Sequence, residues 1–135
     1  MSAADLVANA VGGLRIRQRI HPATKTFQGI RIAINGEMEA LAVTLPKAFR
    51  SLKPGGVLAV ISFHSLEDRM VKRFMRKMAG RPVHRWDRSV LDDRKVCAEM
   101  LNTKIIIPSK EEVEANPRSR SARLRVLRKI EQPNL

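Results

Sequence analysis

The sequence is poor in cysteine and in aromatic residues. It has one cysteine, Cys97, one tryptophan and no tyrosine, and aromatic residues make up 4% of the chain. A single cysteine excludes an internal disulfide and a zinc site built on cysteines, and it fits a reducing compartment. The scarcity of aromatic rings means that the core must be built from aliphatic side chains and methionine.

Long apolar runs and targeting signals are also missing. No stretch approaches the roughly 18 apolar residues that a membrane span needs, so we predict no membrane partner. Asp5 stands where a signal peptide would be positive, and no apolar segment of the required kind follows it. The histidines, His21, His64 and His84, are too dispersed in sequence to indicate a metal cluster, and we predict no metal site. We expect a cytoplasmic protein, with a mitochondrion or plastid as the alternative.

Positive charge is in large excess. The chain has 26 Lys and Arg against 13 Asp and Glu, for a net charge of +13. Such an excess favours a polyanionic partner, because each phosphate that a cation neutralises releases condensed counterions. Nucleic acid is the preferred class, ahead of an anionic membrane or an acidic protein. The length of 135 residues, with 44% apolar residues, suits a single domain, residues 1–135.

The first 20 residues predict the end of a helical region and a basic connector. Ser2 and Asp5 have the spacing of a capping box, and a short apolar helix over residues 6–11 follows and ends at two glycines. Residues 14–20 alternate arginine with apolar residues, which fits either an edge strand or an extended loop. The flanking glycines and Pro22 favour a solvated loop.

Helical periodicity begins at Thr24. Apolar residues recur from there to Leu45 at steps of three and four, which predicts an amphipathic helix. Gly36, after an asparagine, is expected to kink or split this helix. Pro46 is expected to begin a second short helix over residues 47–52.

The next element is a continuous apolar run over residues 57–63. A strand that is apolar on both faces is typical of the middle of a parallel sheet covered by helices. Ser65 and Asp68 have capping-box spacing and open another helix, which Gly80 ends. The order of helix, strand and helix over residues 21–80 is half of a doubly wound α/β unit.

The remaining residues predict a loop and a pair of strands. Residues 81–103 carry little regular pattern, apart from a short helix expected near residues 92–100. Residues 104–130 then form a closing strand pair, with strands at 104–108 and 121–130 and a brief capped helix between them. The second strand alternates apolar residues with arginines, so we expect it to be half exposed with one basic face.

The first candidate site is a group of arginines set among serines, and it consists of Arg118, Arg120, Arg123 and Arg125. Guanidinium forks match phosphate oxygens in a bidentate manner, and serine hydroxyls add neutral donors. Two interpretations carry equal weight: contact with RNA, or a solvated basic edge strand with the turn before it.

The second candidate is the segment just after the apolar strand. In open α/β sheets ligands bind beyond the carboxyl ends of the strands, where His64 and Ser65 stand and where a helix N-terminus presents free N–H groups. The preferred interpretation is structural, with Ser65 as the N-cap and Asp68 as its reciprocal partner. The alternative is that His64 acts as a base or contacts the substrate. Glu67 and Arg69 are expected on a solvated helix face.

A complete active site is not visible in these residues. There is no glycine-rich turn between a strand and a helix followed by an acidic residue, the element that cradles a nucleotide or S-adenosylmethionine. A nucleophile elbow and a paired-carboxylate site are also absent from the sequence. The catalytic residues are therefore unknown, and no cofactor-binding residue is identified.

Three stretches stand out in the order of the chain: residues 21–35 (HPATKTFQGIRIAIN), 52–72 (LKPGGVLAVISFHSLEDRMVK) and 116–126 (NPRSRSARLRV). Together they resemble hallmark stretches of a known family, the RsmH/MraW methyltransferases. The resemblance implies a class I (Rossmann-like) S-adenosylmethionine-dependent methyltransferase with an inserted helical domain. It also implies methyl transfer to the N4 amine of a cytosine near the decoding centre, with small-subunit ribosomal RNA or the ribosomal subunit as partner.

On this template the chain is the C-terminal part of the methyltransferase sheet and lacks the N-terminal strands. Residues 57–63 correspond to the fifth strand, and the region of Ile105 and residues 121–130 to the antiparallel pair that closes the sheet. The family's cofactor residues have no counterparts here, so S-adenosylmethionine is expected from the family alone.

The missing neighbours of the strand over residues 57–63 leave an apolar edge that can pair with other chains. We therefore expect the chain by itself to be marginally stable and inactive. The alternatives are a non-catalytic module that binds RNA or the ribosome, or half of an enzyme completed by a separately encoded piece.

Overall fold

The computed structural model describes residues 2–11, 21, 23–87 and 96–130, and the chain divides into two compact units. The first unit is residues 1–40 and the second is residues 41–135. The predicted basic connector lies outside the described residues.

The first unit is helical and begins with the predicted capping box. Helix α1 (Ala3–Val11) starts after Ser2, whose hydroxyl oxygen accepts the Asp5 N–H at 3.2 Å, while the Ser2 N–H group donates to the Asp5 carboxylate at 2.8 Å. Helix α2 (Ala23–Asn35) contacts α1 and follows His21, whose Nδ1 accepts the Ala23 N–H at 3.3 Å. His21 therefore stands at the entry to α2 and accepts one of its first N–H groups.

The long helical pattern is split at Gly36, as predicted. Gly36 has a φ of 59°, in the left-handed region that favours glycine, and separates α2 from α3 (Glu37–Ser51). The expectation that Pro46 begins a second helix is wrong, because Pro46 lies inside α3. Its missing N–H removes one helical hydrogen bond, but Leu45 and Phe49, one turn apart, are buried in the core and hold the helix together.

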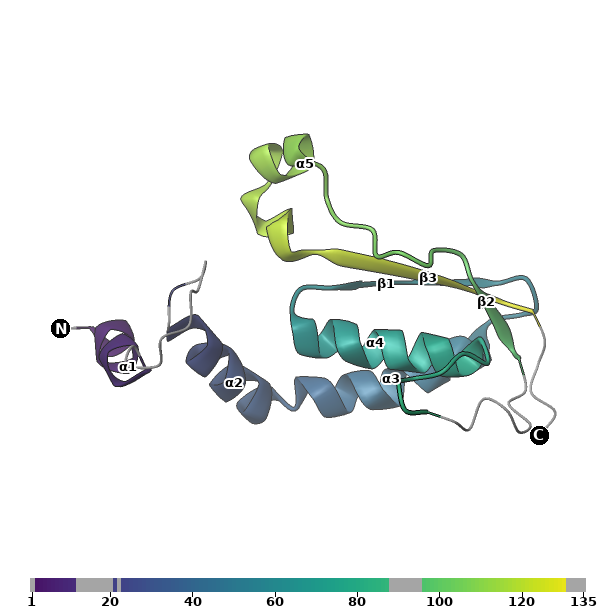
Figure 1. Ribbon diagram of the computed structural model, residues 1–135, viewed down its shortest axis with the longest axis horizontal. Helices are drawn as coiled ribbons and strands as arrows, with labels where there is room; N and C mark the ends of the chain where they lie inside the picture. The colour runs from purple at the N-terminus through teal and green to yellow at the C-terminus, as the bar shows by residue number, and fades with distance from the viewer. Residues whose placement is uncertain (1, 12–20, 22, 88–95, 131–135) are drawn as a thin grey trace. The chain divides into compact units, whose positions relative to one another are not determined.

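The second unit contains a three-stranded antiparallel sheet with the order β1-β3-β2. Strand β1 (Val57–Ser62) pairs with β3 (Arg123–Lys129), which also pairs with β2 (Ala98–Met100). Helices α3 and α4 (Ser65–Met78) lie on the same side of this sheet (Figure 1). The α/β class is confirmed. Among the described residues β1 is an edge strand, in line with the expectation that its neighbouring strands are missing from this chain, and its position inside a larger parallel sheet stays a prediction.

Helices α3 and α4 cover one face of the sheet, and the residues described on the other face are partly exposed. Leu58 lies opposite Leu127 in the register, and Leu127 is fully buried on the helix side. On the opposite face Val57 and Ile61 are 48% and 59% exposed. The prediction that β1 is buried on both faces is therefore wrong for the described part of the chain.

The core lies between the helices and the inner face of the sheet. Its fully buried members are mostly aliphatic or sulfur-containing, as expected, and Phe49 is the exception: Leu45, Phe49, Val71, Met75, Cys97, Ala98 and Leu127. Phe49 packs edge-on against Phe74 with ring centroids 6.1 Å apart. None of the helices in the described ranges is long and apolar enough to cross a membrane.

The segment before β2 differs from the prediction. The helix expected near residues 92–100 is wrong where the chain is described, because Ala98–Met100 forms β2, and residues 88–95 lie outside the described ranges. The Cys97 N–H donates to the Met78 carbonyl oxygen at 2.9 Å, and the Ile130 N–H donates to the Cys97 carbonyl oxygen at 3.0 Å. These long-range bonds and the burial of Cys97 favour the extended form.

The closing strand pair is present in reduced form. Residues 104–108 contribute only a single bridge, between Ile106 and Leu124, rather than a full strand. The brief helix between the strands is α5 (Lys110–Ala115), and the 3₁₀ helix η2 (Pro117–Ser121) leads from it into β3. The strand predicted over residues 121–130 is confirmed as β3.

Candidate nucleic-acid interface at the carboxyl end of β1

The two candidate sites, distant in sequence, meet at one end of the sheet. In the register Ser62, the last residue of β1, lies opposite Arg123, the first residue of β3. One candidate follows β1 directly and the other leads into β3, so the carboxyl end of β1 brings together His64, Ser65 and Arg123, with the η2 residues Arg118 and Arg120 just before β3.

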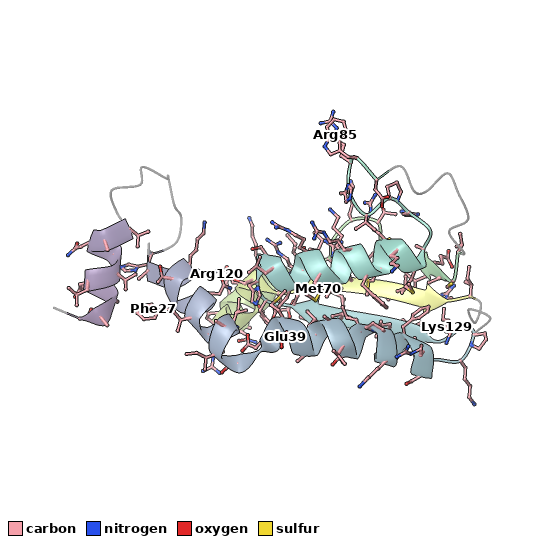
Figure 2. The ribbon with its side chains drawn as sticks, turned by 90° about the horizontal axis from the view of Figure 1, so that it is seen from below. Phe27, Glu39, Met70, Arg85, Arg120 and Lys129 are labelled. Carbon is pink, nitrogen blue, oxygen red and sulfur yellow. The ribbon has the colours of Figure 1, made fainter. Side chains whose placement is uncertain are left out.

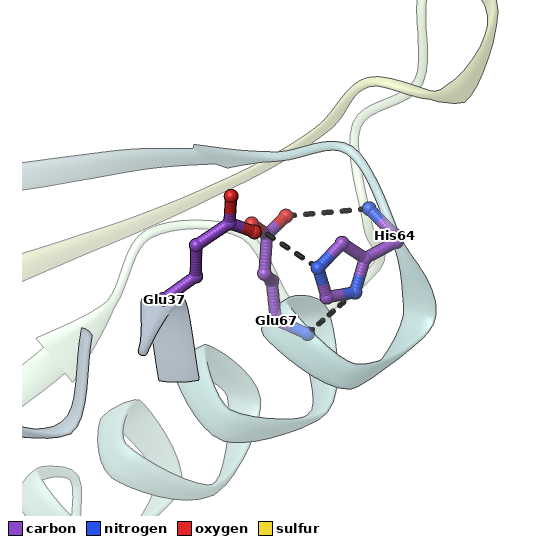
Figure 3. Close-up of side chains that lie close together, drawn as sticks. All are labelled: Glu37, His64 and Glu67. Atoms are coloured by element: carbon purple, nitrogen blue, oxygen red, sulfur yellow. Dashed lines mark hydrogen bonds and ion pairs between the residues drawn. The ribbon is translucent and has the colours of Figure 1, made fainter. Parts of the chain in front are cut away.

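Helix α4 begins with a capping box that is shifted by one residue from the prediction. The N-cap is His64, whose Nδ1 accepts the Glu67 N–H at 3.3 Å. Glu67 Oε2 in turn accepts the backbone N–H group of His64 at 3.3 Å (Figure 3). It also accepts the backbone N–H group of Phe63 at 3.0 Å. The predicted pair of Ser65 as N-cap and Asp68 as partner is wrong, because the glutamate carboxylate at the third helical position reaches back to the N-cap backbone.

These contacts limit what His64 can do chemically. Its side chain is 5% exposed. Because Nδ1 accepts a hydrogen bond, the proton of the neutral ring is on Nε2, which lies 3.3 Å from Glu67 Oε1. Nε2 is buried and makes no hydrogen bond within the described ranges. A general base needs a lone pair directed at the proton it removes, so this geometry favours a capping role for His64 over the alternative of a base.

A buried ion pair joins α4 to β3 at the same end of the sheet. Arg125 Nε donates to Asp68 Oδ1 at 2.8 Å and its terminal nitrogen donates to Oδ2 at 3.1 Å, a bidentate pair. Arg123 approaches the same carboxylate at 3.5 Å. Burial raises the pKa of Asp68, but the hydrogen bonds and charges of the two guanidinium groups outweigh it and hold the pKa below its ordinary value.

The predicted orientation of β3 is inverted. Arg125 and Lys129, on the face expected to be solvated, are only 7% and 1% exposed, and they share that face with Leu127. Leu124 and Val126 lie on the other face of the sheet. The expected exposed basic face is therefore wrong, because Leu127 is drawn into the core and the alternation of a strand carries its neighbours on that face inward too.

The arginines of η2 are the ones that stay at the surface. Arg118 and Arg120 are exposed, and Arg123 is half-buried. Asn116 shapes this turn, because its side-chain oxygen accepts the Arg118 N–H at 3.3 Å and its carbonyl accepts the Ser119 hydroxyl at 2.8 Å. The Ser119 hydroxyl is thus used internally, and binding of phosphate stays a prediction for the exposed arginines.

Sequence reasoning missed Lys129. Its side chain is buried, and Nζ donates to the carbonyl oxygens of Phe49 and Arg50 at 3.2 Å each and of Leu52 at 2.6 Å. It therefore satisfies carbonyls at the C-terminal end of α3, where helical partners are missing and a cation is favoured. The sequence signal that could have located it is its spacing of two residues from Leu127, which puts both side chains on the same face of β3.

An open groove borders the interface on the outer face of the sheet. It measures about 140 Å³ and is lined mainly by apolar side chains, with Glu112 as the charged one: Ile61, Ile106, Ile107, Pro108, Glu112, Ala122 and Leu124. An apolar wall with a carboxylate offers no anchor for phosphate. The exposed arginines of η2 and the half-buried Arg123 at the start of β3, rather than this groove, are the part of the interface suited to a polyanion.

Comparison with known proteins identifies the family. The model of the MraW methylase family matches residues 1–130. The chain is 47% identical over 134 residues to the ribosomal RNA small subunit methyltransferase H of Thermomicrobium roseum, covering 94% of this chain and 39% of that protein. It is 49% identical over 126 residues to the protein of that name from Coprothermobacter proteolyticus, covering 93% and 36%.

The likeness extends to relatives of lower sequence identity. The ribosomal RNA small subunit methyltransferase H of Caulobacter vibrioides is 42% identical over 132 residues, which cover 96% of this chain and 42% of that protein. The chain thus spans about two fifths of the length of these relatives. With a family model matched over almost its whole length, the chain belongs to the MraW methylase family.

Proposed function

We propose that this chain works in the methylation of small-subunit ribosomal RNA, as part of an S-adenosylmethionine-dependent class I (Rossmann-like) methyltransferase that modifies N4 of a cytosine. The observation that carries the proposal is the family match over residues 1–130, with relatives named as ribosomal RNA small subunit methyltransferases. The cytoplasm is the compartment that goes with this function.

The sheet supports this proposal. Strand β1 uses only one of its edges among the described residues, and its outer face carries the exposed apolar residues Val57 and Ile61. A methyltransferase sheet continued beyond β1 would occupy that edge, and its covering helices would bury that face. The antiparallel β1–β3–β2 arrangement fits the closing strands of such a sheet.

The contribution we propose for this chain is to the rRNA-binding surface. Arg118 and Arg120 are exposed, and Arg123 reaches the surface beside them. Guanidinium groups in this setting bind phosphate oxygens and fix the position of an RNA without reading its sequence. The capping contacts of His64 and the Asp68–Arg125 pair keep the carboxyl end of β1 in one geometry.

The described residues do not fit a complete cofactor site. S-adenosylmethionine supplies the methyl group in such enzymes, and its binding requires a glycine-rich turn and an acidic contact, which the sequence does not contain. At the carboxyl end of β1 the two carboxylates, Glu67 and Asp68, are already engaged by protein groups. We therefore propose that the chain by itself does not transfer methyl groups. The alternative function is a non-catalytic module that binds rRNA or the ribosome.

A chimera separates these possibilities. In the Coprothermobacter proteolyticus relative, the matched segment is replaced by this chain, and methyl transfer from labelled S-adenosylmethionine to undermodified small subunits is measured, with the product mapped by mass spectrometry. We expect N4-methylcytosine from the chimera and none from the chain alone. A chimera that folds and binds subunits but transfers no methyl group would favour the non-catalytic alternative. Robust transfer by the chain alone would refute its proposed inactivity.

A further inference from the structure

The outward side of α4 carries a dense set of cations. Arg69, Lys72, Arg73, Arg76 and Lys77 recur at steps of three and four, on the side of the helix opposite the buried Val71 and Met75. We call these five residues the α4 basic face. They span about 12 Å along the helix axis, at 1.5 Å per residue.

Most cations of the α4 basic face have no ion-pair partner among the residues that the structure describes. The sequence contains no Asp or Glu from Arg69 to Trp86. In the described part of the chain, some exposed arginines elsewhere have acidic partners: Arg31 pairs with Glu37 at 3.1 Å and Arg128 with Glu99 at 3.6 Å. No such pair is found in these ranges for Arg69, Lys72, Arg73 or Lys77. This side of α4 therefore presents a positive electrostatic potential to the solvent.

The turn after α4 is held in a defined shape. Gly80 ends the helix with a φ of 63°, and Arg76 Nε donates to the Pro82 carbonyl oxygen, which ties the turn to the helix. The Val83 N–H donates to the Asp87 carboxylate at 2.9 Å, and the Asp87 N–H donates to the His84 carbonyl oxygen at 3.1 Å. These bonds fix the segment that carries Arg85 and Trp86.

Trp86 is displayed at the surface instead of being packed. It is the only tryptophan of the chain and is 77% exposed. The guanidinium carbon of Arg85 lies 5.6 Å from the centre of the indole ring, and Arg85 projects away from the end of α4 (Figure 2). A merely solvated helix face accounts for lysines and arginines, but not for an indole left in water beside them.

We infer that the α4 basic face and Trp86 together form a binding surface for single-stranded RNA, separate from the arginines of η2. The cations neutralise consecutive phosphates, and a base stacks on the face of the exposed indole that Arg85 does not cover. An acidic protein would match the charge but has no planar base for the indole. The choice of RNA over DNA rests on the proposed function.

The single tryptophan makes this surface directly observable. A short oligouridylate is titrated into the full chain at several salt concentrations while Trp86 fluorescence is recorded. We expect quenching that saturates, because the stacked base lies against the fluorophore. Replacing Lys72 and Arg73 together with alanine should lower the slope of log K against log salt by about 1.4, at about 0.7 for each phosphate that the variant no longer neutralises.

A matched control removes the same charge elsewhere. Lys47 and Lys110 are exposed on α3 and α5, and their double replacement by alanine should leave the salt slope nearly unchanged. Circular dichroism confirms that both double variants fold. Equal reductions of the slope in the two variants would mean that binding follows net charge alone and would overturn the inference.

The stacking step has its own test. With labelled oligouridylate followed by anisotropy, Trp86→Ala should weaken binding about 5- to 150-fold, and Trp86→Phe should recover part of the affinity. An unchanged affinity for Trp86→Ala, or equally strong quenching by polyglutamate, would overturn the inference. If the chimera methylates rRNA while these variants bind normally, this surface fails and the proposed function stands. If the variants lose binding as expected and the folded chimera is inactive, this surface stands and the proposed function fails.

Discussion

Removal of the Asp68 carboxylate should destabilise the second unit severely. In Asp68→Ala the guanidinium of Arg125, a residue only 7% exposed, is deprived of both hydrogen bonds to the carboxylate, at 2.8 and 3.1 Å. The charge stays buried, because the backbone of β3 holds Arg125 beside Leu127 on the inner face of the sheet. Arg123 is deprived of the same acidic partner.

The expected loss is about 3 kcal/mol in the free energy of unfolding. Breaking a buried ion pair by removing one partner costs about 3–5 kcal/mol, because an uncompensated charge is left behind. The lower end applies here, because the pair lies at the end of the sheet, where the Asp68 side chain is still 10% exposed. Urea unfolding at neutral pH, followed by circular dichroism, measures the change.

Two further variants distinguish a buried pair from a general effect of charge. Asp68→Leu with Arg125→Met removes both partners and should restore most of the lost stability, since well-packed apolar replacements of a buried pair are often neutral or stabilising. Glu99→Ala removes an exposed partner of Arg128 and should change stability by less than about 1 kcal/mol. A loss below about 1 kcal/mol in Asp68→Ala, or a double variant as unstable as the single one, would refute the reasoning.

The same pair sets a dependence on pH. The pKa of Asp68 in the folded chain is below its ordinary value, so the pair stabilises the fold fully above the unfolded carboxyl pKa, near 3.9. This contribution is lost as the pH falls through the folded pKa. Below about pH 4, the original chain should therefore lose stability more steeply than the double variant in acid titrations of the unfolding free energy.

Three other changes test the remaining interactions. Lys129→Met removes the ammonium group that donates to three carbonyl oxygens at the end of α3, and it should lower the free energy of unfolding in urea by about 2–4 kcal/mol. The control Arg128→Met, on the outer face of β3, should lower it by less than about 0.5 kcal/mol. Similar losses in the two variants would contradict the buried role of Lys129. His64→Ala should lower the free energy of unfolding by about 1 kcal/mol, because the N-cap of α4 is removed, and His64→Asn should lower it much less, because asparagine keeps a side-chain acceptor. Equal losses of the two variants in thermal unfolding would contradict the capping role. Ile61→Lys on the exposed edge strand should reduce self-association measured by sedimentation velocity. Unchanged association would mean that the copies of the chain do not associate through β1.

Local signals in the sequence predict most of the helical elements. Ser2 with Asp5, Gly36 and Gly80 each mark a helix boundary through chemistry confined to a few residues, and the structure has boundaries at these places. The predicted cap of α4 is wrong by one position, because Ser65 is the commoner capping residue and stands next to His64. Glu67, three residues after His64, is the local signal that locates the true cap.

The face assignment of β3 cannot be predicted in the same way. Leu124, Val126 and Leu127 are all apolar, so hydrophobic pattern alone does not say which face is inside. The decision depends on Asp68, 57 residues before Arg125 in the chain, and on carbonyls near Phe49, 80 residues before Lys129. These partners become neighbours only when the sheet forms, so the alternation of β3 by itself points to the wrong face.

This reversal changes what the net charge of +13 means for binding. Arg125 and Lys129 contribute to that total, but their charges are engaged by Asp68 and by the end of α3, and neither can meet a phosphate without unfolding the sheet. The cations open to a polyanion are those at the surface, which in the described ranges include the arginines of η2 and the α4 basic face. Since the salt slope of RNA binding counts only the cations that touch phosphate, it should fall well short of the slope that composition alone would imply. A binding site is therefore better located from the burial of each cation than from their number.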